Sequence, residues 1–516
     1  MKTNIGLLLA KRAELNTHVE ALVDHGTGRR FTFFELNQRA NRCANAMKAR
    51  GVRKGDRVAI LMMNGTEFVE SFFGLAKIGA VVVPLNWRLV PDELEYILKN
   101  AGATVLLYGT EFAENVAELH ARGAGATDLA VFVELGEPHQ RQPFAESYDV
   151  LLDAASPELN EVDAVDDDLL FIMYTSGTTG LPKGSVHSHE SFLWSVITFA
   201  ITAELRFKDR YAIALPMFHV GALLPVVINV YRGATNVMLR EFDPKVMWDL
   251  IEREQITATL AVPSMLNFML LVPGFEAYDY SSLRWIISGA TPVPVTLIER
   301  YAAIGIEVHQ AYGLTESGGP ACMISPDDAL KRIGSTGKAF FHTEVRVVDE
   351  AGNDAPPGVP GELIVRARHI MKGYWRNPEA TAETIRDGWL YTGDVAITDE
   401  DGFITIHDRT KDMIISGGEN VYPAELENTI MGHPSVAEVA VIGIPSERWG
   451  ESPLAVVVVK DGESLTEAQI LKHCDGKLAR FKLPKAAVFV EAIPRNPTGK
   501  ALKRVLREQF PIRALE

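Results

Sequence analysis

The chain has little cysteine, and the few cysteines it has are widely separated. Of its 516 residues, three are cysteine, namely Cys43, Cys322 and Cys474, and no two of them form a CxxC pair. This scarcity excludes a disulfide framework and a cysteine zinc site, and it is typical of a protein from a reducing compartment.

Long apolar runs and an excess of basic residues are also absent from the sequence. No stretch reaches the roughly 18 consecutive apolar residues of a membrane-spanning helix. The short apolar run 6–10 is followed at once by Lys11 and Arg12 and lacks the cleavage site of a signal peptide. We therefore expect a cytoplasmic protein without a transmembrane segment. Peripheral contact with a membrane and formation of an oligomer stay open.

The charge balance argues against nucleic acid as a partner. Lys and Arg number 51 and Asp and Glu 67, which gives a net charge of −16. With 47% hydrophobic and 23% charged residues, the composition is that of a globular protein, and the length suggests about three structural units.

The first hundred residues alternate between helix and strand signals. Thr32 and Glu35 form a capping box before an amphipathic helix that ends near Gly51. Apolar or β-branched runs at 57–63, 81–83 and 104–108 predict strands, separated by helices, of which the last opens at Pro91 and Asp92. This βαβ rhythm predicts a doubly wound, mostly parallel sheet.

Along the rest of the chain, the composition and the predicted secondary structure change three times. Residues 121–168 are rich in Gly, Pro and acidic residues and predict a surface connection between subdomains. A second α/β segment follows over 169–330, and short strands split by turns over 334–408 predict a β-rich subdomain. From 412 to 516 a β-β-α-β pattern predicts a small α+β domain. The expected fold class is therefore α/β, with a large N-terminal domain over 1–408, a hinge at 409–411 and a small C-terminal domain over 412–516.

The most informative run is YTSGTTGLPKG, at residues 174–184, which follows the apolar strand 169–173. Its three glycines and four hydroxyl residues offer many donors to a polyphosphate, and Lys183 adds a positive charge. It is not a Walker A loop, because Pro182 precedes the lysine and Gly184 follows it. Taken alone, the run is equally compatible with a solvated flexible loop.

Two further clusters carry carboxylates. The run QAYGLTES at 310–317 follows the strand 305–308, and its Thr315 and Glu316 can hold a phosphate oxygen and Mg²⁺. The alternative is an ordinary helix N-terminus. The run GWLYTGD at 388–394 ends in Asp394, which can accept from ribose hydroxyls or can simply be a turn aspartate.

The last two clusters lie towards the C-terminus. The charged run that opens DRTKDMIISGGENVYP, at 408–423, falls where the β-rich segment ends, so it is either an interdomain hinge or a solvated turn. The run PRNPTGK at 494–500 is a tight loop that presents Lys500, which taken alone would be an ordinary surface lysine.

In this order and spacing, the five clusters resemble the adenylate-forming superfamily of acyl-CoA synthetases, firefly luciferase and peptide-synthetase adenylation domains. The resemblance covers essentially the whole chain. Within the superfamily, the sequence is similar to bacterial fatty-acyl-CoA synthetases in the runs IMYTSGTTG (172–180), PMFH (216–219) and MIISGGENVYP (413–423).

The resemblance implies an ATP-dependent acid–thiol ligase. Such an enzyme activates a carboxylic acid, here expected to be a medium- or long-chain fatty acid, as acyl-AMP with release of pyrophosphate. It then transfers the acyl group to CoA, so ATP, Mg²⁺ and coenzyme A are the implied cofactors and co-substrates. The implied function belongs to fatty acid metabolism.

The resemblance also implies a role for each matching residue. The implied catalytic residues are Lys500, Glu316, Thr315 and His219. The implied ATP and AMP contacts are Thr175, Ser176, Gly177, Thr178, Thr179, Gly180, Lys183, Gly289, Ala290, Gln310, Ala311, Tyr312, Gly313, Asp394 and Arg409. The implied metal ligands are Thr175 and Glu316, and the implied CoA contacts are Gly417, Gly418 and Asn420.

Three of these positions have a more specific implied role. Lys500 would bridge the α-phosphate and the carboxylate, and Lys411 would be the hinge about which a mobile small domain swings after adenylation. His219 would gate the passage between the CoA tunnel and the acyl pocket, the alternative being a histidine packed in the core. His187 and His189 show no metal spacing, and we interpret them as structural.

Three rival functions stay open. An aryl or hydroxycinnamoyl-CoA ligase would use the same machinery, and an adenylation domain would load a carrier protein. An enzyme-derived binding protein would lack activity, although each expected polar group is present. No carrier domain follows Glu516, and the Met-rich pocket candidates favour an aliphatic acid over an aromatic one. These candidates are Val220, Leu223, Leu224, Met265, Phe268, Met269 and Met323.

Overall fold

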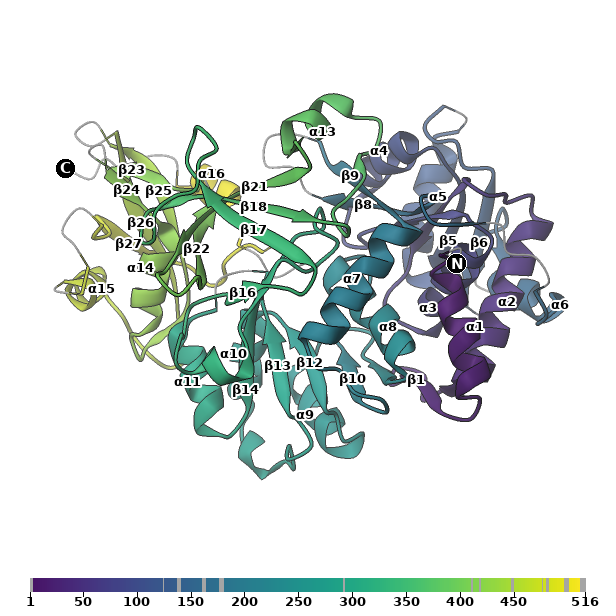
Figure 1. Ribbon diagram of the computed structural model, residues 1–516, viewed down its shortest axis with the longest axis horizontal. Helices are drawn as coiled ribbons and strands as arrows, with labels where there is room; N and C mark the ends of the chain where they lie inside the picture. Colours follow the sequence, from purple (N-terminus) through teal and green to yellow (C-terminus); the bar gives the residue numbers. More distant parts are fainter. Residues whose placement is uncertain are drawn as a thin grey trace.

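The computed structural model describes the whole chain except residues 1–2, 124, 137–140, 160–163, 176–180, 291–292, 410–411, 417–418, 447–449, 476, 479–481, 496–500 and 511–516. Of residues 407–409, 415, 419–420 and 450 it describes the backbone alone. Within these limits the chain forms four sheets, three in the large N-terminal part and one in the C-terminal domain (Figure 1).

Two large sheets form the body of the N-terminal part. One has the strand order β16 (Lys338–Ala339), β15 (Cys322–Met323), β14 (Glu307–Tyr312), β13 (Trp285–Ser288), β12 (Ala258–Ala261), β10 (Arg210–Ile213), β11 (Thr235–Met238), β1 (Glu20–Asp24), β2 (Arg30–Thr32). The other has the order β19 (Gly373–Tyr374), β9 (Lys183–Ser188), β8 (Leu169–Thr175), β4 (Val81–Pro84), β3 (Arg57–Leu61), β5 (Ala103–Gly109), β6 (Val131–Leu135), β7 (Glu146–Ser147). Their central strands pair in parallel, as the βαβ rhythm predicts.

The two smaller sheets lie further along the chain. The β-rich subdomain contains β17 (Thr343–Val348), β18 (Gly361–Ala367), β21 (Trp389–Thr398) and β20 (Ile385–Arg386), with β22 (Ile404–Arg409) paired to β21. The C-terminal domain contains β24 (Glu419–Val421), β23 (Ile414–Ser416), β26 (Gly450–Val459) and β25 (Val436–Ser446), with β27 (Ala486–Phe489) paired to β26. Both sheets agree with the predicted change of pattern after residue 334 and again after 412.

Helices cover the sheets. In the N-terminal part these are α1 (Gly6–Leu15), α2 (Phe33–Ala49), α3 (Thr66–Lys77), α4 (Pro91–Ala101), α5 (Ala113–Ala121), α6 (Tyr148–Ala154), α7 (His189–Thr202), α8 (Val220–Arg232), α9 (Pro244–Arg253), α10 (Pro263–Leu270), α11 (Val295–Ala303), α12 (Pro326–Ala329) and α13 (Pro378–Thr384). In the C-terminal domain they are α14 (Pro423–Met431), α15 (Glu467–Cys474) and α16 (Lys503–Gln509). As predicted, Thr32 caps α2 through a full capping box with Glu35.

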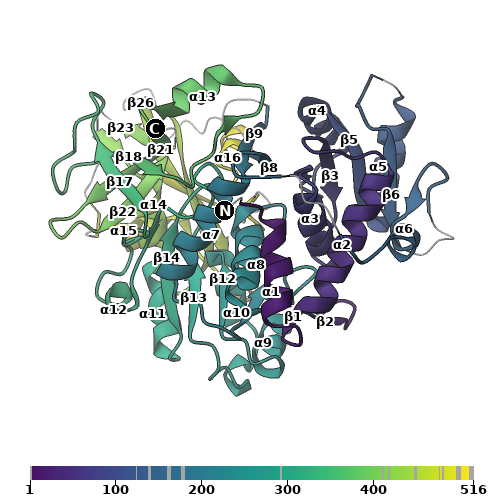
Figure 2. The same ribbon diagram turned by 45° about the vertical axis from the view of Figure 1, so that its right-hand side comes forward.

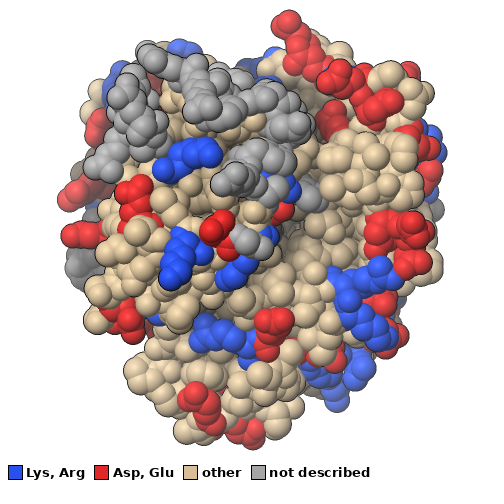
Figure 3. Space-filling view, turned by 90° about the vertical axis from the view of Figure 1, so that its left-hand side faces the viewer, with Lys and Arg blue, Asp and Glu red and all other residues tan. Residues whose placement is uncertain are grey.

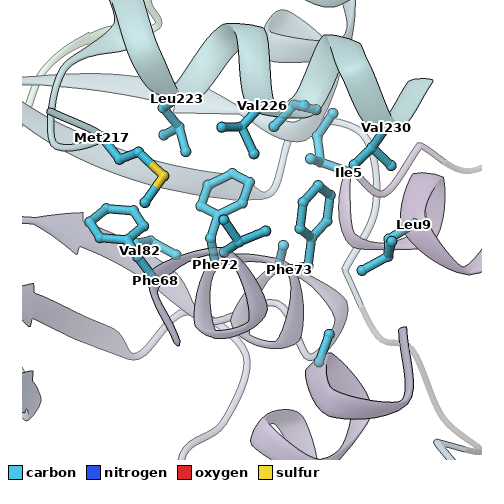
Figure 4. Close-up of a cluster of buried hydrophobic side chains, with 14 of the residues drawn as sticks. Ile5, Leu9, Phe68, Phe72, Phe73, Val82, Met217, Leu223, Val226 and Val230 are labelled. Carbon is cyan, nitrogen blue, oxygen red and sulfur yellow. The ribbon is translucent and has the colours of Figure 1, made fainter. Parts of the chain in front are cut away.

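The largest hydrophobic cluster lies between the two large sheets, around α1, α3 and α8 (Figure 2). Phe72 projects from α3 towards Leu223 and Val226 of α8 (Figure 4). On either side of it, Phe68 lies beside Met217 and Phe73 lies beside Val230. Each such side chain contributes about 1.5–3 kcal/mol when it is removed from water. This cluster fixes α8, and with it the loop that precedes α8, against the rest of the N-terminal part.

One sequence-based expectation about the connections is wrong. Residues 121–168 are not a surface connection between subdomains, because β6, β7 and α6 extend the eight-stranded sheet and its covering layer. The two α/β segments expected from the sequence do not form separate sheets either. Strand β1, from the first hundred residues, joins the nine-stranded sheet, whereas β8 and β9, from the second segment, join the eight-stranded sheet. Sheet membership is set by packing between distant segments, which a local pattern does not encode.

Within the described residues, no helix has both the length and the hydropathy required to cross a membrane.

Candidate active site

The ends of the glycine and hydroxyl loop are held by an antiparallel strand pair. Thr175 ends β8 and pairs with Lys183, which begins β9. The Thr175 hydroxyl donates to Glu316 Oε1 at 3.1 Å, which links this loop to the second predicted cluster. Ser176, Gly177, Thr178, Thr179 and Gly180 lie outside the described residues.

The second cluster forms a turn rather than the start of a helix. Leu314 N–H donates to Ser317 Oγ, and Gly319 N–H donates to the Leu314 carbonyl at 2.9 Å. The turn presents Thr315 and Glu316 beside the end of β8. The alternative of a helix N-terminus for this Thr-Glu pair is therefore wrong.

The adenine-binding candidates lie at the carboxyl ends of two neighbouring parallel strands. Ser288 of β13 pairs with Gln310 of β14, so the predicted residues Gly289 and Ala290 lie next to Gln310–Tyr312. A side chain at Gly289 would overlap the Ala311 carbonyl oxygen, so only glycine allows this close approach. Ligands of α/β sheets bind at such strand ends.

One buried polar atom in this group lacks a partner. Gln310 is 4% exposed, its amide nitrogen donates to the Gly334 carbonyl, and its Oε1 has no hydrogen-bond partner among the described residues. A buried polar group without a partner is rare in native proteins, and a bound ligand is one way to satisfy it.

Asp394 belongs to β21 and is therefore not an isolated turn aspartate. It is 4% exposed and accepts a hydrogen bond of 2.5 Å from the Tyr312 hydroxyl. In the β21–β22 pair it lies opposite Arg409, the second residue implied for the ribose. The Arg409 side chain lies outside the described part of the structure.

Six of the predicted nucleotide contacts line a cavity of about 630 Å³ that the N-terminal part shares with the C-terminal domain, whereas Thr175, Lys183, Thr315 and Glu316 are not among the described residues that line it. The N-terminal part contributes Ala290, Gln310, Ala311, Tyr312, Gly313 and Asp394. The C-terminal domain contributes Asp412, Glu438, Arg495, Ala501 and Lys503. Figure 3 shows the side of the molecule that carries the C-terminal domain, where basic and acidic side chains are intermixed.

The loop that carries Lys500 begins and ends at this cavity. Arg495 and Ala501, which flank it, form an isolated β-bridge, and both line the cavity. An ion pair of 2.5 Å between Arg495 and Glu438 anchors the first end. Lys500 lies outside the described residues, as do Lys411, Gly417 and Gly418, and Asn420 is described by its backbone in β24 alone.

His219 lies directly before α8. Burial lowers the pKa of His219 to about 3, with a further contribution from Arg88, so the ring is neutral. Its Nε2 has no hydrogen-bond partner among the described residues, and its ring centroid lies 4.3 Å from that of Phe218. A neutral ring whose Nε2 lacks a partner among the described residues is compatible with both a gate and a histidine packed in the core, so the gating role stays a prediction.

The seven acyl-pocket candidates do not form one group. Val220, Leu223, Leu224 and Met323 belong to the hydrophobic cluster between the two large sheets. Met265 and Met269 belong to a separate cluster around α9 and α10, and Phe268 is 42% exposed and lines the cavity. A side chain at Gly319 would overlap Leu224 Cδ2 and would lie 3.7 Å from Val220 Cγ2. Leu224 and Val220 therefore pack against the turn that carries Glu316.

Three residues contact the predicted site and were not assigned to it from the sequence. Tyr374 donates to Glu316 Oε1 at 3.0 Å. His187 and His369 hydrogen-bond to the carbonyls of Thr315 and Ser317. Burial lowers the pKa of both histidines to about 4, so each ring is neutral. His187 is fully buried and bonds to a backbone carbonyl, as the structural interpretation predicts, and nothing in the sequence indicates that this carbonyl belongs to the site.

Known proteins resemble this chain over nearly its full length. The family model for AMP-binding enzymes matches residues 9–375, and the model for the C-terminal domain of AMP-binding enzymes matches residues 425–500. The long-chain-fatty-acid–CoA ligase FadD13 of Mycobacterium tuberculosis is 45% identical over 98% of each chain. A feruloyl-CoA synthase from an Amycolatopsis species is 39% identical over 98% of this chain and 99% of its own.

A solved structure gives the same result for the fold. The anthranilate CoA ligase AuaEII in complex with anthranoyl-AMP matches with a TM-score of 0.93 and 30% identity, over 99% of this chain and 97% of that chain. The chain belongs to the AMP-binding enzyme family.

Proposed function

We propose that the protein is an ATP-dependent acyl-CoA synthetase that acts on a medium- or long-chain fatty acid. The observation that carries this proposal is the convergence of three groups on one region: the strand ends at Gly289–Ala290 and Gln310–Gly313, the Tyr312–Asp394 pair, and the ends of the loop that carries Lys500. The fatty acid–CoA ligase relative supports the reaction class.

The reaction proceeds in two balanced steps. A carboxylate oxygen of the acid attacks the α-phosphorus of ATP, the bond to the β-phosphate breaks, and pyrophosphate leaves. The sulfur of CoA, after loss of its thiol proton, then attacks the acyl carbon, the bond from that carbon to the AMP oxygen breaks, and AMP leaves. The first step is needed because a carboxylate oxygen cannot leave as oxide, whereas the same oxygen bonded to the α-phosphorus leaves as part of AMP.

Different described residues would contact different parts of ATP. The backbone at Gly289 and Ala290 and the 310–313 segment would enclose the adenine, and Asp394 would accept from the ribose hydroxyls. Thr175, Lys183 and Thr315 would contact the phosphates. Donors that are fixed before the reaction stabilise the charge that grows on phosphorus, because they need no rearrangement as it develops.

The pair Thr175 and Glu316 fits Mg²⁺ accompanying ATP. Their side-chain oxygens lie 3.1 Å apart, and Mg²⁺ commonly takes one or two protein oxygens together with phosphates and waters. No cluster of three or more His, Cys, Asp or Glu side chains suited to a metal is found in the described part of the chain, and a nucleotide-borne ion does not require one. When bound, Mg²⁺ neutralises charge on the phosphates. We propose the cytoplasm as the location, because ATP and CoA are available there.

The identity of the acid is tested by a screen for pyrophosphate release. Octanoate, laurate, palmitate, ferulate and anthranilate would each be offered with ATP, and with either CoA or a carrier protein as acceptor. We expect turnover to rise with chain length among the fatty acids and to require CoA. Faster turnover of ferulate or anthranilate would assign the protein to the aryl-CoA ligases instead, and turnover with the carrier alone would contradict the CoA assignment.

A further inference from the structure

The turn at residues 314–319 carries Thr315 and Glu316 and is fixed by groups from distant segments. The Thr315 carbonyl oxygen lies 2.8 Å from His187 Nε2. The Glu316 carbonyl accepts from Met371 N–H at 2.7 Å, and the Ser317 carbonyl lies 2.7 Å from His369 Nδ1. Three successive carbonyls therefore each receive a donor, two of them from the segment 369–371.

The same segment also contacts the Glu316 side chain. The Tyr374 hydroxyl donates to Glu316 Oε1 at 3.0 Å, the oxygen that also accepts from Thr175. The Lys183 ammonium lies 5.2 Å from the centroid of the Tyr374 ring, within the range of a cation–π contact. One tyrosine thus contacts both a carboxylate and a cation implied in ATP binding.

The segment from His369 to Tyr374 is itself anchored. Its end, β19, pairs with β9, the strand that follows the phosphate loop, and Lys372 N–H donates to the Val186 carbonyl at 2.8 Å. His369 is fully buried, and its Nε2 lies 2.8 Å from the Thr343 hydroxyl. Because the Ser317 carbonyl can only accept, His369 Nδ1 must carry the hydrogen.

The turn packs closely against the segment that carries His369, so the two are expected to move together. Gly318 has a φ of +69°, and a side chain there would overlap Ser195 Oγ and lie 2.8 Å from the His369 carbonyl oxygen. Displacement of the turn would therefore carry the Thr315 and Glu316 side chains with it.

We propose that His369 and Tyr374 are positioning residues for adenylation, which hold the Glu316 carboxylate where it would bind the Mg²⁺ that accompanies ATP and the Thr315 hydroxyl where it would contact the phosphates. The proposal rests on the proposed function, since it assigns Glu316 to ATP. A displacement of about 1 Å in a reacting group can cost about 100-fold in rate. The second half-reaction, on preformed acyl-adenylate and CoA, does not involve the β- and γ-phosphates and needs this positioning less.

The test compares variants that differ in one hydrogen-bonding group. Tyr374→Phe removes the hydroxyl and keeps the ring beside Lys183. His369→Leu removes the donor to Ser317, whereas His369→Asn keeps a donor close to the Nδ1 position. Tyr278→Phe, which removes a hydroxyl that bonds to the Asp249 carboxylate, is the matched control. Each variant would be assayed for pyrophosphate formation, for conversion of supplied lauroyl-adenylate with CoA, and for the rise in melting temperature caused by MgATP.

We expect Tyr374→Phe and His369→Leu to lower adenylation about 10–100-fold, to reduce the MgATP-induced rise in melting temperature, and to leave the second half-reaction near normal. His369→Asn should recover most of the loss. Equal losses in both half-reactions, equal effects of Leu and Asn at position 369, or a normal Tyr374→Phe enzyme would overturn the proposal. Failure of the wild type to adenylate any acid would instead contradict the proposed function, and the MgATP-induced change in melting temperature still tests the positioning.

Discussion

Tyr312 donates a hydrogen bond of 2.5 Å to Asp394, and this contact connects the nine-stranded sheet to the β-rich subdomain. The two residues are implied to contact different parts of one nucleotide, the adenine and the ribose. Their direct contact means that the position of one fixes the orientation of the other.

Replacing Asp394 should weaken ATP binding selectively. Asp394→Asn keeps the shape of the side chain but removes the charge that strengthens hydrogen bonds from the ribose hydroxyls. Because a hydrogen bond to a charged group contributes about 1.5–3 kcal/mol, we expect the KM for ATP to rise about 10-fold or more. Tyr312→Phe should raise it less. Steady-state kinetics would measure both, with the exposed Asp461→Asn as control. An unchanged KM for ATP in Asp394→Asn would contradict the ribose assignment.

A side chain at Gly313 should displace the turn that carries Glu316. A Cβ at this position would overlap the Gly319 carbonyl oxygen, and overpacking of this kind typically costs about 1–3 kcal/mol. Gly313→Ala should therefore lower the melting temperature and reduce adenylation more than the second half-reaction. Gly26→Ala, whose nearest atom would be 3.5 Å away, is the control. A fully active Gly313→Ala enzyme would show that the turn tolerates movement.

The gating role of His219 predicts unequal effects on the two half-reactions. If the ring separates the CoA tunnel from the acyl pocket, His219→Ala should slow thioester formation more than adenylation. Both half-reactions would be timed in a rapid-quench instrument on the same preparation. Equal losses, or none, would favour a histidine that only packs in the core.

Lys77 should make stability depend on alkaline pH. It is 1% exposed at the end of α3, its Nζ donates to Asn37 and Asn41, and burial lowers its pKa to about 7 from an ordinary value of 10.5. Between these two values the unfolded chain binds the proton and the folded chain does not. The free energy of unfolding should therefore rise with pH in this window, by at most about 1.4 kcal/mol per pH unit.

Urea unfolding at pH 7.5 and 9.5 would measure the free energy of unfolding of the wild type and of each variant, and the change between the two pH values would be compared. Lys77→Met should lose the rise in stability that the wild type gains, whereas Lys11→Met, at an exposed lysine, should keep it. A Lys77→Met variant with the same pH dependence as the wild type would show that Lys77 titrates normally in the folded state.

The sequence predicts those parts of the fold that depend on local signals. The Thr32–Glu35 capping box, the helix opened by Pro91 and the strand before Thr175 are all present. The segment 121–168 was predicted wrongly because its strand β6 joins a sheet whose other members come from elsewhere in the chain.

The site residues also divide into those that a local sequence run indicates and those that only the folded chain brings to the site. Residues within the five motif runs, such as Thr175 and Glu316, could be assigned from the sequence by resemblance. Tyr374 and His369 could not, since each is a single residue that reaches the site through β19 and its neighbours. Their contacts span more than 50 residues of sequence and leave no local pattern.

We propose that both half-reactions take place at one site and that the C-terminal loop supplies the lysine for the first. The most direct measurement is of the two half-reactions in Lys500→Ala, with circular dichroism to establish folding. Losing one positioned donor typically costs about 10²–10³ in rate. We expect adenylation from ATP to fall by this amount, while supplied acyl-adenylate and CoA still give acyl-CoA at near-normal speed. Normal adenylation, or an equal loss of both steps in a folded variant, would contradict it.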